Sequence, residues 1–258
     1  MASPAVRVLE HHLVVYRATW RGSVVSTFLA PVLYLLAMGI GLGSIIDPAS
    51  SEAHLGGVSY LAFVGPGLLA AAAMQTAAGE SMFPIMAGVK WLRTYHAMLA
   101  GPIGVRDLVL GQFLWMAFRI GTVALAYLAT ITLFGVVDSP LALLSPFAAL
   151  LCGMAFAGPI AAFAATREND QAFGLIFRLA VLPLFLFSGT FFPVSQLPAV
   201  VQPVAWVTPL WHGVQLTRGL VLGTLGPGEA LLHVGYLTIC VTIGWTMALR
   251  TFARRMAA

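Results

Sequence analysis

The sequence predicts an all-α integral membrane protein with six transmembrane helices, and three observations lead to this fold. Hydrophobic residues make up 60% of the 258 residues and charged residues only 9%, whereas soluble domains carry about 25% charged residues. Uncharged apolar runs recur at the length that a membrane crossing requires, and the charges between them alternate in sign. No hydrophilic block is long enough for a soluble domain, so we expect residues 1–258 to form one transmembrane domain.

Residues 4–21 precede the first apolar run and are expected to form an amphipathic helix that lies in the membrane plane. Ser3 suits the N-cap position and Pro4 the first helical position. Apolar side chains recur every three or four residues along one stripe, which the charged residues avoid: Val6, Leu9, Leu13, Tyr16 and Trp20. The alternative is an ordinary helix of the bundle.

Six mainly apolar segments reach the roughly 20 residues that a helix needs to cross the hydrocarbon core. In chain order they are 22–46, 55–79, 108–137, 139–166, 171–190 and 230–250. Arg119 interrupts the third run and Arg178 the fifth. An intramembrane charge is costly and is a functional hypothesis by default. We favour the alternative for both arginines, which is that they extend to the inner interface or pair within the protein.

The charges outside these runs predict the orientation. One set of loops and both chain ends carry basic residues, namely Arg7, Arg17, Arg21, Lys90, Arg93, Arg106, Arg167, Arg250, Arg254 and Arg255. The alternate loops carry Asp47, Glu52, Asp138 and Glu229, with Arg218 as their only basic residue. The positive-inside rule then places both termini in the cytoplasm, which requires an even number of crossings.

The apolar stretch from Gln171 to Thr217 is too long for one crossing, yet two crossings would place the C-terminus outside. We therefore expect one crossing over 171–190, followed by a re-entrant segment over 191–228. Prolines break this segment into short pieces: Pro193, Pro198, Pro203 and Pro209. Irregular backbone at membrane depth is tolerated only where it is buried in protein or lines a wet cavity, so the segment is expected to line or cap a pathway.

Two features stand out at the cytoplasmic face. A short helix is expected over 90–100, ended by Gly101 and Pro102. Its residues Trp91, Tyr95 and Met98 share a face and predict an exposed docking surface for a partner; the alternative is that this helix packs onto its own bundle. The polar turn from Arg167 to Asp170 is either a solvated turn or a second contact point.

The sequence lacks the motifs that are typical of several classes of function. The sequence has no G-x-x-x-x-G-K-[ST] phosphate loop, so the chain is not expected to bind ATP itself. No metal or nucleophile motif occurs: Cys152 and Cys240 lie in apolar runs, and the histidines are scattered through the predicted topology. The basic residues sit at membrane boundaries, which favours a topological role over nucleic-acid binding. Carboxylates are nearly absent from the spans, with Glu80 at the inner end of the second, which argues against an ion-coupled carrier.

Two stretches carry a resemblance to a known family. The run from Phe187 to Pro198, with Thr208 to His212, resembles the C-terminal signature of type-2 ATP-binding-cassette (ABC) export permeases, most of all their lipooligosaccharide and nodulation-factor branch, with the daunorubicin-resistance permeases nearby. The segment from Thr94 to Pro102 is similar to that branch's cytoplasmic loop. Gln112 stands where a glutamate is common, which leaves a conserved charge pairing with Arg119 in question.

The resemblance implies a half-transporter. Two permease chains, identical or sister, would enclose a pathway and dock two copies of a separate ABC ATPase, which would bind the ATP and magnesium. It implies an elbow helix at 4–21, a coupling helix at 90–100 and re-entrant helices within 191–228. The implied ATPase-coupling residues are Lys90, Trp91, Arg93, Tyr95, His96, Met98, Arg167, Glu168 and Asp170. The implied pathway and outer-gate residues are Ser188, Gly189, Phe191, Phe192, Pro193, Pro209 and Trp211; an interfacial aromatic belt is the alternative for the aromatic ones.

The implied function is export through the bacterial cytoplasmic membrane by a permease subunit that is not itself an enzyme. The expected wall of Leu, Phe, Ala and Val suits a lipid-linked glycan, a glycolipid or an amphipathic drug. One alternative is an ATP-independent secondary carrier or channel. Another is a membrane-embedded lipid-modifying enzyme, although the clustered Asp or His residues typical of that class are missing.

Overall fold

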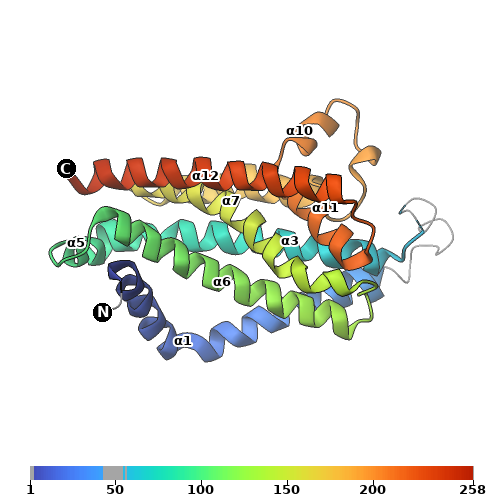
Figure 1. Ribbon diagram of the computed structural model, residues 1–258, viewed down its shortest axis with the longest axis horizontal. Helices are drawn as coiled ribbons and strands as arrows, with labels where there is room; N and C mark the ends of the chain where they lie inside the picture. Colours follow the sequence, from blue (N-terminus) through green and yellow to red (C-terminus); the bar gives the residue numbers. More distant parts are fainter. Residues whose placement is uncertain (1–2, 43–54, 56, 258) are drawn as a thin grey trace.

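The computed structural model describes residues 3–42, 55 and 57–257, and the regular secondary structure of these residues is entirely helical. The predicted all-α class is therefore confirmed. The long helices run side by side along one axis, and the chain forms a single bundle (Figure 1). Residues 43–46 and 56 of two expected spans lie outside the described residues, as do Asp47 and Glu52.

Five helical runs in the described part of the chain are long and apolar enough to cross a membrane: Pro4–Met38, Tyr60–Trp91, Val105–Leu133, Pro140–Thr166 and Pro227–Met256. Their elements are α1 (Pro4–Leu35), η1 (Leu36–Leu42), α3 (Tyr60–Ser81), α4 (Phe83–Met86), η2 (Ala87–Trp91), α6 (Val105–Leu133), η3 (Pro140–Leu144), α7 (Ser145–Thr166) and α12 (Pro227–Ala257). Residues expected as a further span form the shorter apolar run Gln171–Phe187, which comprises α8 (Gln171–Ile176), η4 (Phe177–Val181) and α9 (Leu182–Phe187).

Helix α1 joins two segments that the sequence analysis separates, because one α-helix continues from Pro4 to Leu35. Ser3 occupies the N-cap position, as expected. Figure 1 shows the helix changing direction after its first turns. Those first turns pack against α6, where Val8 is buried and a Cβ added to Gly111 would lie 2.4 Å from the Val8 Cβ. Only a glycine at position 111 permits this approach.

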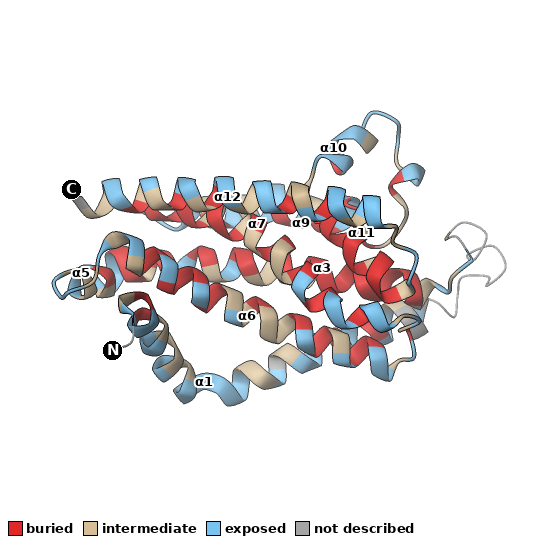
Figure 2. Ribbon diagram, in the orientation of Figure 1, coloured by how far each residue is buried: buried red, intermediate tan, exposed pale blue. Residues whose placement is uncertain are grey.

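Helix α3 is the centre of the bundle. It is buried along most of its length, whereas α1 is largely exposed (Figure 2), and α6, α7 and α11 (Pro209–Leu222) pack around it. Lipid tails are as apolar as leucine, so helix association in a membrane depends on close packing, and small residues let backbones approach. The buried face of α3 is accordingly rich in alanine: Ala70, Ala71, Ala73, Ala77 and Ala78.

At two helix crossings around this centre, the position held by a glycine has no room for a side chain. A Cβ added to Gly158 of α7 would lie 2.4 Å from the Gly244 carbonyl carbon of α12. A Cβ added to Gly213 of α11 would lie 2.3 Å from the Cys152 sulfur. Cys152 therefore acts as a small packing residue, and no disulfide joins it to Cys240.

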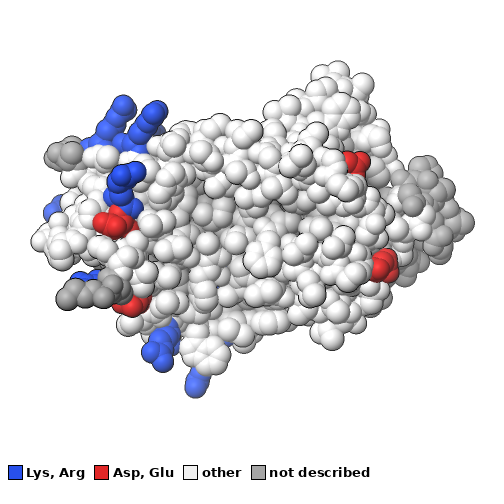
Figure 3. All heavy atoms as spheres, in the orientation of Figure 1, with Lys and Arg blue, Asp and Glu red and all other residues white. Residues whose placement is uncertain are grey.

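The bundle has two chemically different ends. The first and last described residues lie at one end together with α5 (Thr94–Leu99), and most of the Lys and Arg side chains visible in Figure 3 gather there. We call this the basic end. The opposite end carries η5 (Val194–Gln196) and α10 (Gln202–Trp206), and α10 projects from the side of the bundle there (Figure 1). We call this the α10 end.

We predict that Gly158→Ala destabilises the bundle by about 1–3 kcal/mol, the usual cost of overpacking, because the new methyl group would meet the backbone of α12. The measurement is the unfolding midpoint of the purified chain in detergent. Gly235→Ala is the control, since a Cβ there meets nothing within 4 Å. Equal midpoints for the two variants would contradict the close α7–α12 crossing.

Candidate functional site

At the basic end, Glu168 joins three segments that are far apart in the sequence. Its carboxylate lies 3.0 Å from the Lys90 Nζ and 2.6 Å from the Arg255 Nη2, and Lys90 also donates to the Glu168 carbonyl oxygen. The hydrogen bond from Lys90, followed by that from Arg255, lowers the pKa of Glu168 below its ordinary value. The bridge is thus formed at neutral pH and is lost only as the pH falls through this lowered pKa. Exposed ion pairs add little stability. The effect of the Glu168 bridge is therefore to hold the three segments next to one another.

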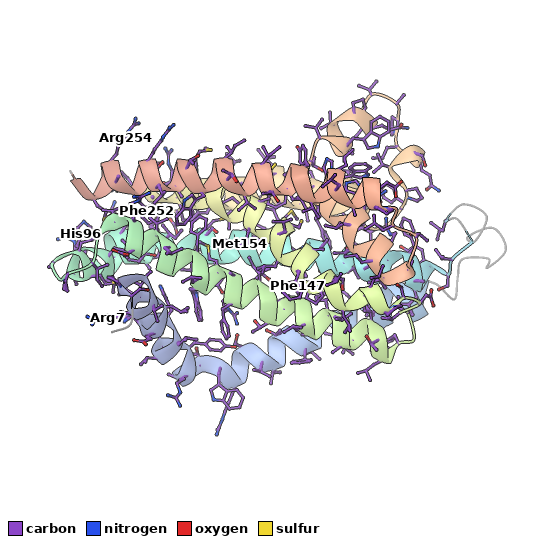
Figure 4. The ribbon with its side chains drawn as sticks, in the orientation of Figure 1. Arg7, His96, Phe147, Met154, Phe252 and Arg254 are labelled. Atoms are coloured by element: carbon purple, nitrogen blue, oxygen red, sulfur yellow. The ribbon has the colours of Figure 1, made fainter. Side chains whose placement is uncertain are left out.

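This bridge borders a cavity of about 510 Å³ that is mainly basic, lined by Val89, Lys90, Arg93, His96, Glu168 and Arg255. Figure 4 shows His96, Phe252 and Arg254 toward this end of the bundle and Phe147 toward the other. The structure therefore brings together four of the expected coupling residues, Lys90, Arg93, His96 and Glu168. Of the others, Met98 is half-buried against the core, Arg167 lies over the Phe163 ring, and Asp170 stands at the start of α8.

The expected exposed aromatic face needs a correction, because Tyr95 does not belong to it. Arg93 adopts a left-handed conformation with φ 52°, so the predicted helix over 90–100 is broken between η2 and α5. The break separates two residues that a continuous helix would align: Trp91 is 54% exposed and Tyr95 only 2%. The Tyr95 hydroxyl donates to the Gln112 Oε1 at 3.0 Å. The alternative, packing onto the bundle, therefore holds for Tyr95, and Trp91 stays exposed beside Leu92.

Glycine makes room for the Tyr95 ring. A Cβ added to Gly88 would lie 2.5 Å from the Tyr95 Cζ, so the ring lies directly against the η2 backbone. Burial also raises the pKa of the Tyr95 hydroxyl, which keeps it protonated as a donor. Gln112 thus serves as a hydrogen-bond acceptor for the loop rather than as a partner of Arg119.

Arg119 instead pairs with Glu80, which the sequence analysis noted only as a carboxylate at the end of a span. The Arg119 Nε lies 2.9 Å from the Glu80 Oε1, and the Trp115 Nε1 donates to the other carboxylate oxygen at 3.0 Å. The Arg119 Nη1 donates to Ser23 at 2.8 Å and to Tyr16 at 3.3 Å. Of the two structural roles left open for Arg119, pairing within the protein therefore holds, and it links α1, α3 and α6.

Arg178 differs from Arg119 in its surroundings. It lies on η4 with an exposed side chain, and no ion pair to it occurs among the residues that the structure describes.

At the α10 end, the predicted gate residues gather around a sharp turn. Gly189 has φ +82°, a conformation that favours glycine. The hydroxyls of Ser188 and Thr208 share a hydrogen bond of 3.2 Å, and Thr208 also accepts from the Trp211 amide at 3.3 Å to cap α11. Pro209 occupies the first turn of α11. These contacts place Ser188 and Gly189 beside the start of α11.

The aromatic residues of this end pack against the same turn. A Cβ added to Gly189 would lie 3.6 Å from the Trp211 Cδ1, and the Phe191 ring meets the Phe185 ring edge-on at 5.0 Å. Phe192 and Pro193 are half-buried. These side chains therefore form part of the packed structure of the α10 end.

Arg218 is a residue that the sequence analysis used only for counting charges. Its guanidinium donates to the Phe63 carbonyl at 3.0 Å and to the Gly189 carbonyl at 2.8 Å, and it lies 3.7 Å from the centre of the Phe63 ring. It ties the Gly189 turn to α3. The sequence feature that could have pointed to this role is that Arg218 is the one basic residue in an otherwise acidic set of loops.

His212 and His233 correct the expectation of scattered histidines. Their Nδ1 atoms face each other at 2.8 Å across the α11–α12 contact, and Tyr236 stacks on His212 at 3.8 Å. The spacing of these two histidines in the sequence does not predict their contact, because it is the turn between α11 and α12 that brings them together. No group of three potential metal ligands occurs within the described ranges.

We predict that the Glu80–Arg119 pair has a coupling energy of about 1–2 kcal/mol, as neighbouring groups in one network show. The measurement is a double-mutant cycle on the unfolding free energy with Glu80→Gln, Arg119→Gln and both together. Each single variant leaves its partner unpaired, so the double variant should lose less than the sum. Arg178→Gln is the control, with little change expected, and strict additivity of the two changes would contradict the pairing.

Comparison with known proteins identifies the family. The family described as ABC-2 type transporter matches residues 10–222. Nodulation protein J of Rhizobium leguminosarum bv. trifolii is 30% identical, with 97% of this chain and 93% of the relative covered. Nodulation protein J of Neorhizobium galegae is 28% identical over the same shares, and that of Rhizobium meliloti (strain 1021) is 27% identical over 89% of this chain and 84% of the relative.

The resemblance inferred from the sequence is thereby confirmed. The match covers the loop that carries Trp91, the α7–α8 turn and the α10 end. The chain is a permease and not an ATPase, and the family implies that a separate ATPase subunit accompanies it. The chain therefore belongs to the ABC-2 type transporter family, as a multi-pass permease subunit of an exporter in the bacterial cytoplasmic membrane.

Proposed function

We propose that this chain is a half-transporter that exports an amphiphile, with a lipid-linked glycan or glycolipid favoured over an amphipathic drug. The observation that carries the coupling part is the convergence of η2, the α7–α8 turn and the end of α12 on Glu168. The resemblance to the lipooligosaccharide and nodulation-factor branch supports the substrate class, as does the name nodulation protein J of the relatives.

The proposed topology has six crossings with both termini in the cytoplasm. The run Gln171–Phe187 would be the fifth crossing: at about 1.5 Å per residue it extends roughly 26 Å, near the lower limit for a span. The gathering of basic side chains where both chain ends lie supports this orientation (Figure 3). Residues 4–21 would serve as the elbow helix, and α10 with α11 as the re-entrant segment 191–228.

The proposed docking surface combines an apolar contact with surrounding positive charge. Trp91 and Leu92 are exposed at the basic end, and the cavity beside them is lined mainly by basic side chains. Two copies of the ATPase, each binding ATP and magnesium, would engage two permease chains. ATP would shift the equilibrium between the two conformations of the transporter only by the difference between its binding free energies for them.

The assembly would pair this chain with a second permease chain, identical or sister. Helices α1 and α12 bury little of their surface within the single chain, which leaves apolar faces for a second permease and for lipid. The turn at Gly189 with Phe191, Phe192 and Trp211 would form the outer gate. An aromatic belt at the membrane interface is the alternative role for those three rings.

We predict that Trp91→Ala combined with Leu92→Ala reduces recovery of the ATPase at least tenfold, because two exposed apolar side chains that form the centre of an interface contribute about 1–2 kcal/mol or more. The measurement is a pull-down from native membranes in mild detergent, quantified by mass spectrometry. The wild-type chain should recover a phosphate-loop ATPase at one copy per permease. Leu133→Ala combined with Val200→Ala is the matched control, since each of these side chains is 86% exposed away from the basic end.

Two outcomes would contradict separate parts of this proposal. If the wild-type chain is recovered without an ATPase, an ATP-independent carrier becomes the better explanation. If the Trp91 and Leu92 variant recovers the ATPase as well as the control does, the docking surface lies elsewhere on the chain. Any sister permease would appear in the same wild-type sample.

A further inference from the structure

A cavity of about 220 Å³ lies between α1, α3 and α6, away from both ends of the bundle. Helix α1 contributes Thr27 and Tyr34, α3 contributes Gln75 and Thr76, and α6 contributes Arg119 and Tyr127, with apolar side chains between them. Arg119 is the middle residue of Val105–Leu133, about 21 Å along a 1.5 Å rise from its start. The cavity thus lies at membrane depth.

Three of these polar side chains have no hydrogen-bond partner in the described part of the protein. Those of Gln75, Thr76 and Tyr127 make no hydrogen bond within the part of the chain that the structure describes, although Tyr127 is only 4% exposed. In hydrocarbon a polar group without a hydrogen bond is costly. Their convergence on one cavity therefore leaves several hydrogen-bonding groups available to a polar ligand.

The backbone of α1 adds an acceptor to the same cavity. Pro31 lies within the helix and lines the cavity. Because proline has no N–H, the carbonyl of Thr27 loses the donor that position i+4 normally supplies. The cavity wall formed by α1 therefore combines the Thr27 hydroxyl with a backbone carbonyl that lacks its usual helical hydrogen bond.

The charges at the cavity select among head groups. Glu80 already neutralises Arg119, and no carboxylate lines the cavity among the described residues. The lining therefore presents hydroxyl, amide and guanidinium groups with no unpaired charge. Such a set matches hydroxyls and amides, and it supplies no counter-ion for a cationic head group.

The size and the surroundings of the cavity indicate how a ligand would enter. Pockets for drug-sized ligands measure about 300–1,000 Å³, so this smaller cavity suits one compact head group rather than a whole amphiphile. Tyr34 is exposed at its rim, and the neighbouring Phe28, Leu29 and Leu33 of α1 are exposed and apolar. Lipid chains could lie along these side chains while the head group enters the cavity.

We propose that this cavity is an intramembrane binding site for the uncharged, hydroxyl-rich head group of a lipid-anchored molecule, which enters from the bilayer past α1. The proposal deepens the proposed function, and it rests on that function for the identification of the ligand as cargo. Gln75, Thr76 and Tyr127 are the residues that would bind the head group. Tyr34 would close the side that faces the lipid.

The test uses the full-length chain in phospholipid nanodiscs without ATPase. Two photoreactive probes share one diazirine-bearing dodecyl tail and differ in the head group, maltose or phosphocholine. Saturation labelling, mapped to peptides of α1, α3 and α6, gives an apparent Kd for each probe. Gln75→Leu, Thr76→Val and Tyr127→Phe each remove hydrogen-bonding groups with little change of shape. Thr242→Val on α12 is the matched control, since the hydroxyl of Thr242 donates to the Thr238 carbonyl of its own helix at 2.8 Å.

We expect each cavity variant to raise the apparent Kd for the maltoside about three- to tenfold, the loss of roughly one hydrogen bond. Thr242→Val should leave it unchanged, and phosphocholine labelling should stay constant throughout, which also reports that the fold is intact. Unchanged maltoside labelling in all three variants would overturn the site. Equal weakening of both probes would overturn the selection of a hydroxyl-rich head group.

The labelling result and the ATPase pull-down can fail independently. Selective maltoside labelling in a chain that recovers no ATPase would support the site and reject the half-transporter. Recovery of the ATPase without selective labelling would support the half-transporter and overturn this site.

Discussion

Close packing through small residues is the constraint on which this bundle depends. In a membrane the lipid competes equally well for apolar side chains, so helices remain together only where their surfaces approach closely. Helix α3 meets this requirement with alanines, and glycines permit the crossings of α7 with α12 and of α11 with Cys152. These crossings fix how closely α7 approaches α11 and α12.

The arginines within the bundle follow a second rule, because a charge inside a membrane protein is costly unless it is paired or hydrogen-bonded. Arg119 pairs with Glu80, and Arg218 is held by the carbonyls of Phe63 and Gly189. Both arginines therefore have roles that the folded chain itself explains. Gln75, Thr76 and Tyr127 differ from these arginines, because they line a cavity and make no hydrogen bond to the described part of the protein.

The two ends of the bundle are connected by continuous packing. At the basic end, Glu168 holds the end of α12 beside the loop that carries Trp91. Helices α7 and α12 then pack along each other, and α12 meets α11 at the facing histidines His212 and His233. Helix α11 in turn begins beside the turn at Gly189, where the hydroxyls of Ser188 and Thr208 share a hydrogen bond. Buried Tyr95 anchors the loop to α6 through its hydrogen bond to Gln112.

The sequence by itself determined the helical class and the apolar runs, because transfer of a segment into lipid depends on local composition. It also indicated the family, through the residues from Phe187 to Pro198 and from Thr94 to Pro102. It left two structural roles open for Arg119, extension to the inner interface or pairing within the protein, and did not name Glu80 as the partner. Only the tertiary structure decided the burial of Tyr95, the hydrogen bond from Arg218 to the Gly189 carbonyl and the contact of His212 with His233. Each depends on the rotation and separation of helices distant in the chain or on one left-handed residue, Arg93. Hydrophobic periodicity does not predict such contacts, because it indicates which face of a helix is apolar and not which side chain lies opposite that face.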